Sequence, residues 1–265
     1  MSLSTPAEVH SHLQPWFLQL PVTIALAIAA LVYLRAWFSL RRESPNVVPV
    51  WRAVAFMGGV SSVWIAVASP LTALDHQLLT IHMLKHLLLM AVAAPLILLG
   101  TVKLPSLDSL PKSPGRSPNL VLCWLAGTTT VIGWHFPAAF QLALQSPWWH
   151  AAEEVSFLLA GLLFWWPVVQ SRPGSGQRWS VPLYLFLATL PCDILSAFLA
   201  FCGRVVYPSY LAAPRLLDLS PLQDQECAGA LMWVSVTFIY LIPAVIITVQ
   251  ILSPGGQTNA RAAQT

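Results

Sequence analysis

Residues 75–100, DHQLLTIHMLKHLLLMAVAAPLILLG, decide the fold of this chain. The run is apolar and long enough for a helix to cross a bilayer, which takes roughly 20 residues, yet its first turns carry His82, Lys85 and His86. Ionisable groups inside a bilayer are costly, so they usually face a bundle interior, where they line a path, pair with one another or hold a metal. His82 and His86 are spaced i,i+4, which places both imidazoles on one helical face.

The composition of the whole chain predicts that the bilayer is its solvent. Apolar residues make up 57% of the sequence and charged residues 9%, whereas an ordinary soluble domain is about one quarter charged. Helices are the expected spans, because backbone polar groups in lipid must be satisfied within the segment. We predict an all-α, polytopic membrane protein with one bundle of seven transmembrane helices, at residues 16–38, 52–70, 77–100, 119–136, 150–170, 181–203 and 227–252.

Arginine and lysine placement predicts the orientation of this bundle. Positive charges flank the cytoplasmic ends of spans, and here they cluster around the first, third and fifth connections, at Arg35, Arg41, Arg42, Arg52, Lys103, Lys112, Arg116, Arg172 and Arg178. We therefore predict an external N-terminal tail (1–15), a transmembrane domain (16–252) and a cytoplasmic C-terminal tail (253–265). The net charge of +3 follows from these loops, so the sequence indicates a lipid partner and no nucleic-acid partner.

Reporter fusions at Pro111 and Pro214 test this orientation. We expect a cytoplasmic signal at Pro111 and an external signal at Pro214, because the loop around Pro111 carries Lys and Arg and the positive-inside rule places it in the cytoplasm. The opposite pattern of reporter activity would overturn the predicted orientation.

With this orientation, the polar residues of several spans fall at one membrane depth. We expect His82, His86, His135 and His150 to converge around one outer-leaflet cavity, with Glu153 or Glu154 as a further ligand or as a group that orients one. Lys85 should pair inside the bundle with Asp193, Glu153 or Glu154, because a bare intramembrane cation is costly. His76 is expected in a solvated loop, and Cys202 and Cys227 could form a disulfide, which an external compartment permits.

A layer of His, Glu, Asp, Cys and Met suits a transition metal, since imidazole binds copper, zinc and iron and sulfur favours Cu(I). Met83, Cys202, Cys227 and Met232 could lie at comparable heights. The same histidines could instead bind haem, relay protons, or hydrogen-bond to neighbouring helices without any ligand. These alternatives stay open at the level of residue spacing.

Several motifs together resemble the multi-spanning CtaG family of cytochrome c oxidase assembly factors. They occur in order over roughly residues 50–250: HMLKHLLLMAVAAPLILLG (82–100), WHFP (134–137), HAAEEVSFLLAGLLFWWPV (150–168), PCDILSAFL (191–199), YPSY (207–210) and DQECAGALMW (224–233). The resemblance implies a seven-helix protein of the bacterial inner membrane that helps to mature a haem-copper oxidase, with copper handled at the outer face.

The resemblance also implies which positions matter, namely His82, His86, His135, His150, Glu153, Asp193, Asp224, Gln225, Met232 and Trp233. Two positions depart from the usual family pattern, which commonly has Gln in place of Lys85 and a second His in place of Glu154. From the resemblance as a whole we expect an assembly factor without turnover chemistry of its own, which delivers copper to haem-copper oxidase subunits. The alternatives are a transporter or proton-path protein that uses the same His, Lys and Asp groups, and a metal-free structural scaffold.

Overall fold

The computed structural model describes residues 6–43, 48–101, 119–170, 179–213 and 218–253, with backbone only for 6–18 and 170. All regular structure in these ranges is helical. The helices are α1 (Pro6–Glu43), α2 (Val50–Ala68), α3 (Leu79–Leu87), α4 (Ala94–Gly100), α6 (Leu120–His135), α7 (Pro137–Gln145), α8 (Pro147–Gln170), α9 (Ser180–Phe201) and α10 (Pro221–Leu252). A π-helix, η2 (Leu88–Ala93), joins α3 to α4, and two short 3₁₀ turns are η1 (Pro70–Ala73) and η3 (Pro208–Leu211).

The all-helical membrane fold is confirmed, with six helices in the described ranges long and apolar enough to cross a bilayer. The fourth predicted span is the exception. The predicted segment 119–136 is α6, a helix of 16 residues, and α7 continues it after a bend of 75° at Phe136. Counting this pair as one span makes seven. The break follows from Pro137, which starts α7 and disfavours helical geometry at the residue before it.

The helix ends differ from the predicted spans mainly at the first and the last helix of the chain. Helix α1 begins at Pro6 instead of residue 16, so part of the predicted N-terminal tail is helical. Helix α10 begins at Pro221 instead of residue 227, because Ser220 and Gln223 form a reciprocal capping box there. The predicted loop at 101–118 and the C-terminal tail lie almost wholly outside the described residues.

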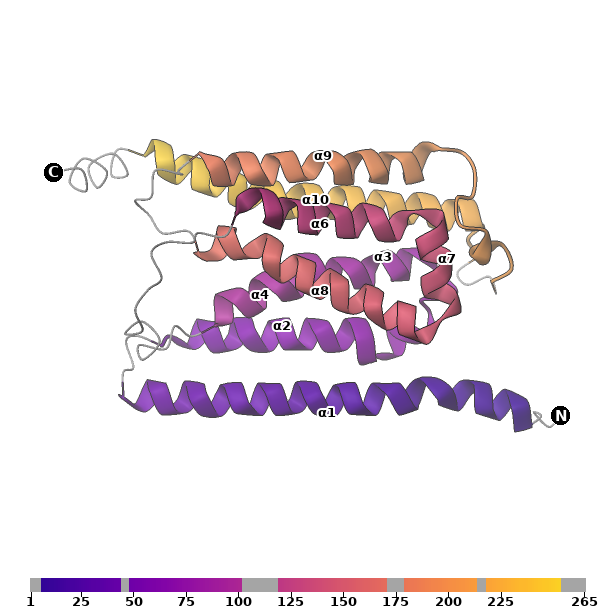
Figure 1. The fold of residues 1–265 in the computed structure, drawn as a ribbon, viewed down its shortest axis with the longest axis horizontal. Helices are drawn as coiled ribbons and strands as arrows, with labels where there is room; N and C mark the ends of the chain where they lie inside the picture. The colour runs from indigo at the N-terminus through magenta and orange to yellow at the C-terminus, as the bar shows by residue number, and fades with distance from the viewer. Residues whose placement is uncertain (1–5, 44–47, 102–118, 171–178, 214–217, 254–265) are drawn as a thin grey trace.

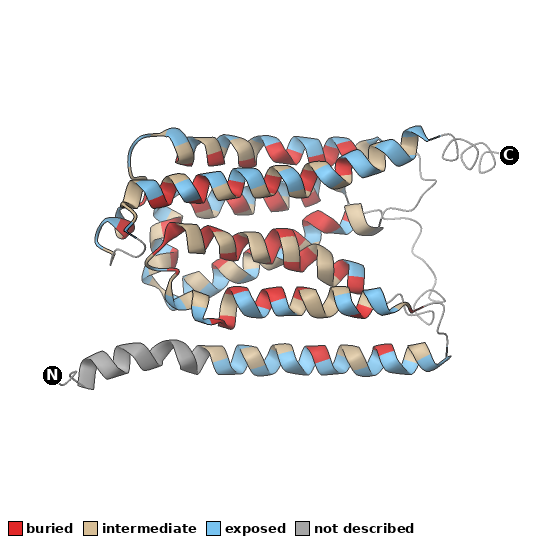
Figure 2. Cartoon of the chain, turned by 180° about the vertical axis from the view of Figure 1, so that it is seen from behind, coloured by how far each residue is buried: buried red, intermediate tan, exposed pale blue. Residues whose placement is uncertain are grey.

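The bundle has a compact centre and one peripheral helix (Figure 1). Helices α9 and α10 pack along each other, α8 packs on α6 and α4, and α2 packs on α4. Helix α1 lies beside α2 at the edge of the bundle. From residue 19 onward, most of its side chains are exposed (Figure 2). Large apolar side chains cover much of the outer surface, as expected of a surface that meets acyl chains.

The third span is widened by the π-helix, and aromatic and glycine neighbours accommodate it. Trp165 Nε1 donates a hydrogen bond of 3.0 Å to the Met90 carbonyl. A Cβ atom at Gly161 would lie 2.9 Å from the Met90 backbone, so only glycine permits α8 to approach this closely. Single-turn π segments inside α-helices are frequent at functional sites.

Candidate metal centre

A cluster of buried ionisable side chains lies at one end of the bundle, where α3 begins. Its members come from α3, from α8 and from the segment that precedes α3. His82, Asp75 and Glu153 are 0% exposed and Lys85 is 1% exposed. Since such groups are almost never fully buried without partners, their contacts determine what this cluster can do.

Helix α3 is positioned by a carboxylate from α10, a helix that is distant in sequence but adjacent in space. The backbone N–H groups of Leu79 and Thr80 donate to Asp224 of α10, over 2.6 and 3.1 Å, and the Thr80 hydroxyl donates to the same side chain. These N–H groups belong to the first turn, which has no intrahelical acceptors. Asp224 therefore sets the position of the helix that carries His82 and His86, and it does not contact the cluster as a ligand.

Gln225 positions the site indirectly, by organising the segment after α9. Its side chain accepts from the Val206 N–H (2.7 Å) and donates to the Arg204 carbonyl (3.0 Å). This segment continues to Tyr207 and Tyr210, whose hydroxyls donate to the carbonyls of His135 (2.9 Å) and Asp75 (3.0 Å). Burial raises the pKa of Tyr210 well above its ordinary value, so this hydroxyl stays protonated and can keep donating.

Asp75 orients the first histidine. Its Oδ1 lies 2.7 Å from His82 Nδ1, so Nδ1 carries the proton and, in the neutral ring, Nε2 presents a lone pair. A carboxylate behind an imidazole is the usual arrangement that fixes a metal-binding histidine. Burial opposes ionisation of Asp75, yet His82, His150 and Lys85 together hold its pKa well below the ordinary range.

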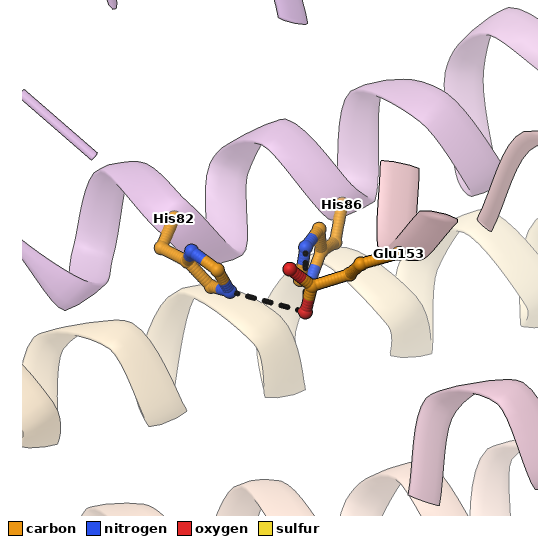
Figure 3. A group of neighbouring side chains, drawn as sticks. All are labelled: His82, His86 and Glu153. Atoms are coloured by element: carbon orange, nitrogen blue, oxygen red, sulfur yellow. Dashed lines mark ion pairs between the residues drawn. The ribbon is translucent and has the colours of Figure 1, made fainter. Parts of the chain in front are cut away.

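His82, His86 and Glu153 converge on one point, with ligand atoms all within 4.8 Å of one another (Figure 3). The Nε2 atoms of both histidines lie 3.5 Å from Glu153 Oε1. Donor atoms about 2.0–2.1 Å from a tetrahedral metal are roughly 3.3–3.4 Å apart. The spacing to the carboxylate is therefore close to that of two ligands sharing one ion.

The polar atoms at this point lack hydrogen bonds among the described residues. They are both carboxylate oxygens of Glu153, His82 Nε2 and His150 Nδ1; His86 Nδ1, the ring nitrogen that does not face Glu153, also lacks a hydrogen bond. A buried carboxylate without a hydrogen bond costs far more than an ordinary unpaired polar group. A cation between these atoms would satisfy several of them at once.

Lys85 is paired inside the bundle, as predicted, and one of its predicted partners is confirmed. Its ammonium lies 2.9 Å from Glu154 Oε1 and 2.5 Å from Asp75 Oδ2. The pairing with Asp193 is wrong, because Asp193 faces Thr237 of α10 at 3.4 Å. Asp75 was missed as a partner because it precedes the span, and its position ten residues before Lys85 gives no helical register.

His150 and Glu154 form the partly exposed edge of the cluster. Their side chains are 18% and 15% exposed, and His150 Nε2 lies 3.1 Å from Asp75. His150 Nδ1 lies 3.5 Å from Glu153 Oε2, so this ring contacts the central carboxylate from the outside. His76 is exposed, as expected, and its ring centroid is 5.7 Å from that of His150.

His135 lies next to this group instead of within it. Its ring centroid is 6.1 Å from that of His86, and its Nε2 lies 3.1 Å from Met83 Sδ. Met232 is buried on the same side of the bundle core, whereas Trp233 is 37% exposed and packs edge-on against Phe201. Cys202 and Cys227, which could have formed a disulfide, are both free cysteines.

The cluster carries excess negative charge. The cluster holds three carboxylates and one ammonium: Asp75 and Glu154 contact Lys85, whereas Glu153 contacts the histidines. With neutral imidazoles, two negative charges therefore remain uncompensated in a buried site. Because buried charges must be paired, either bound cations or protonated histidines supply the missing positive charge.

A double-mutant cycle tests the contact between Lys85 and Glu154. We expect Lys85→Gln and Glu154→His each to lower thermal stability, and the double variant to lose less than the sum by about 0.5–3 kcal/mol, because the two side chains contact each other. Thermal unfolding in nanodiscs measures this. Strictly additive losses would show that the pair is energetically uncoupled.

The chain is similar in sequence to proteins from mycobacteria. The chain is 26% identical over 286 residues to uncharacterised proteins of Mycobacterium bovis and Mycobacterium tuberculosis, and 22% identical over 293 residues to one of Mycobacterium leprae. Each match covers 98% of this chain, which spans only 42% of the length of these relatives. No solved structure matches the chain significantly.

A family model matches nearly all of the helical bundle. It is described as cytochrome c oxidase caa3 assembly factor (Caa3_CtaG) and covers residues 31–253. This range includes every side chain of the cluster, from Asp75 before α3 to Glu154 of α8. The chain therefore belongs to the Caa3_CtaG family of cytochrome c oxidase assembly factors.

Proposed function

We propose that this protein assists the assembly of a caa3-type oxidase by holding copper briefly and passing it to oxidase subunits. The proposed site is His82, His86 and Glu153 at the outer face of a bacterial inner membrane, a location that the positive-inside pattern of the loops supports. One observation carries the proposal: a fully buried carboxylate without hydrogen bonds faces two imidazole nitrogens at 3.5 Å. Two imidazoles with one carboxylate suit copper, although zinc accepts the same donors.

The arrangement suits transfer better than permanent storage. A closed structural site has four protein ligands, whereas three side chains meet here. Glu153 contacts His150, which is partly exposed and gives a route to the surface. Lys85 does not repel a cation strongly, because Asp75 and Glu154 neutralise its ammonium. No turnover chemistry is part of this proposal.

Metal analysis of the purified chain tests the proposal. The full-length protein in nanodiscs should bind copper, and His86→Ala should lower its affinity by at least about tenfold, as losing part of a metal environment does. His76→Ala is the matched control, since this exposed imidazole lies outside the three-residue group. A protein that binds no copper, or a His86→Ala variant that binds as tightly as wild type, would refute the proposal.

A second candidate is a proton path through the same cluster, and the charge balance supports it. Protonation of two imidazoles would supply the two missing positive charges without any metal. Intramembrane acids and histidines commonly form such relays. In that case purified protein would take up no copper, while proteoliposomes would show proton flux that Glu153→Gln abolishes.

A further inference from the structure

A small cavity borders the candidate copper site. Its volume is about 30 Å³, more than the roughly 10–15 Å³ that one water requires. The donor-bearing side chains in its wall come from α3, η2, α6, α9 and α10, and they are Met83, His86, Met90, His135, Cys192 and Met232. His86 is thus shared between this cavity and the group with Glu153.

The wall of this cavity is rich in sulfur. The chain has five methionines, and apart from Met1 only Met57 lies outside the cavity wall. Methionine is a common filler of irregular gaps, so sulfur alone does not indicate a ligand site. The orientation of His135 supplies the second, independent observation.

His135 directs a lone pair at a methionine sulfur. Its Nδ1 lies 2.7 Å from the Val131 carbonyl oxygen. A carbonyl can only accept, so Nδ1 carries the proton and the neutral ring presents a bare Nε2. This Nε2 lies 3.1 Å from Met83 Sδ, and a thioether has no proton to donate. Two buried acceptors therefore face each other, and a soft cation between them would turn this contact into a pair of bonds.

A sequence of imidazoles leads from the surface to this contact. The ring centroid of the partly exposed His150 lies 6.2 Å from that of His82. The His82 and His86 centroids are 4.3 Å apart, and those of His86 and His135 are 6.1 Å apart. An ion held at His82 and His86 would therefore move a distance comparable to the 6.1 Å between the ring centroids of His86 and His135 to reach His135 in the cavity wall.

From these contacts we propose a second metal site in this cavity, specific for Cu(I), with His135 and Met83 as ligands and Met90 or Met232 completing the set. Thioether and imidazole donors select Cu(I) over harder ions. The ion enters as Cu(I) from the His82, His86 and Glu153 site and leaves as Cu(I), so no electron is transferred. The supply route rests on the proposed function, whereas the ligand chemistry of the cavity does not.

Competition with a chromogenic Cu(I) chelator, with X-ray absorption at the copper edge, tests this proposal on the full chain in nanodiscs. Wild type should bind two Cu(I) ions and show a copper–sulfur shell. Met83→Leu, which keeps the apolar volume, should lose one ion and weaken the sulfur shell, as should the one of Met232→Leu and Met90→Leu that removes the third ligand. Met57→Leu is the matched control and should behave as wild type.

The outcomes separate this proposal from the preceding one. One bound ion without a sulfur shell, unchanged in Met83→Leu, would overturn the inner site and leave the outer site standing. One bound ion with sulfur ligands, retained in Glu153→Gln, would support the inner site and overturn the outer one. Binding of Cu(I) at the same stoichiometry in Met83→Leu and His135→Phe, with both variants folded, would also refute the inner site.

Discussion

Replacing Asp75 with asparagine is expected to destabilise the folded protein by about 3–5 kcal/mol, the usual cost of leaving a buried charge without its partner. The Asp75 carboxylate contacts Lys85, His82 and His150 at 2.5, 2.7 and 3.1 Å. Asparagine keeps the shape of the side chain but removes its charge, so the ammonium of Lys85 would depend on Glu154 alone. Thermal unfolding in nanodiscs measures the effect.

Two further variants make this prediction specific. Glu43→Gln removes an exposed carboxylate at the end of α1 and should leave stability within about 0.5 kcal/mol of wild type. Asp75→Asn combined with Lys85→Met should recover part of the loss, because the ammonium that lost its Asp75 partner is also removed. An Asp75→Asn protein as stable as wild type would show that the ion pair does not hold the cluster together.

Replacing Glu153 with glutamine is expected to have the largest effect on function. The central anionic oxygen is lost, so copper affinity and caa3 oxidase activity in membranes should each fall about 10–100-fold. The abundance and thermal stability of the protein should remain equal or rise, because the variant removes a buried carboxylate that makes no hydrogen bond among the described residues. Oxidase activity and immunoblots of the same membranes measure both quantities.

This pair of measurements separates a metal ligand from a structural charge. If Glu153 only joined α8 to α3 through the histidines, Glu153→Gln would lower protein abundance together with oxidase activity. His86→Ala should follow the same pattern as Glu153→Gln, with activity lost and abundance largely kept. Full oxidase activity in Glu153→Gln would show that Glu153 is not needed for the assembly function.

The sequence by itself determined the membrane class, the approximate helix positions and the face shared by His82 and His86. Hydropathy and length are enough for the spans, because lipid demands long apolar helices. The i,i+4 spacing is equally local, and the structure brings both imidazoles to Glu153. The CtaG resemblance, carried by short ordered motifs, is confirmed by the family match over residues 31–253.

Only the tertiary structure decided which way each helix faces and which loop residues reach the cluster. In a membrane bundle, side chains toward lipid and toward the core are both apolar, so the hydropathy pattern does not indicate which face of a helix points inward. Asp193 therefore looked equivalent to Glu154 as a partner for Lys85, but it faces Thr237. The place of Asp75 depends on a turn before α3, and the convergence of Met83, Met90 and Met232 depends on packing three helical segments around one cavity. Long-range packing sets these contacts, and no local pattern in the chain encodes them.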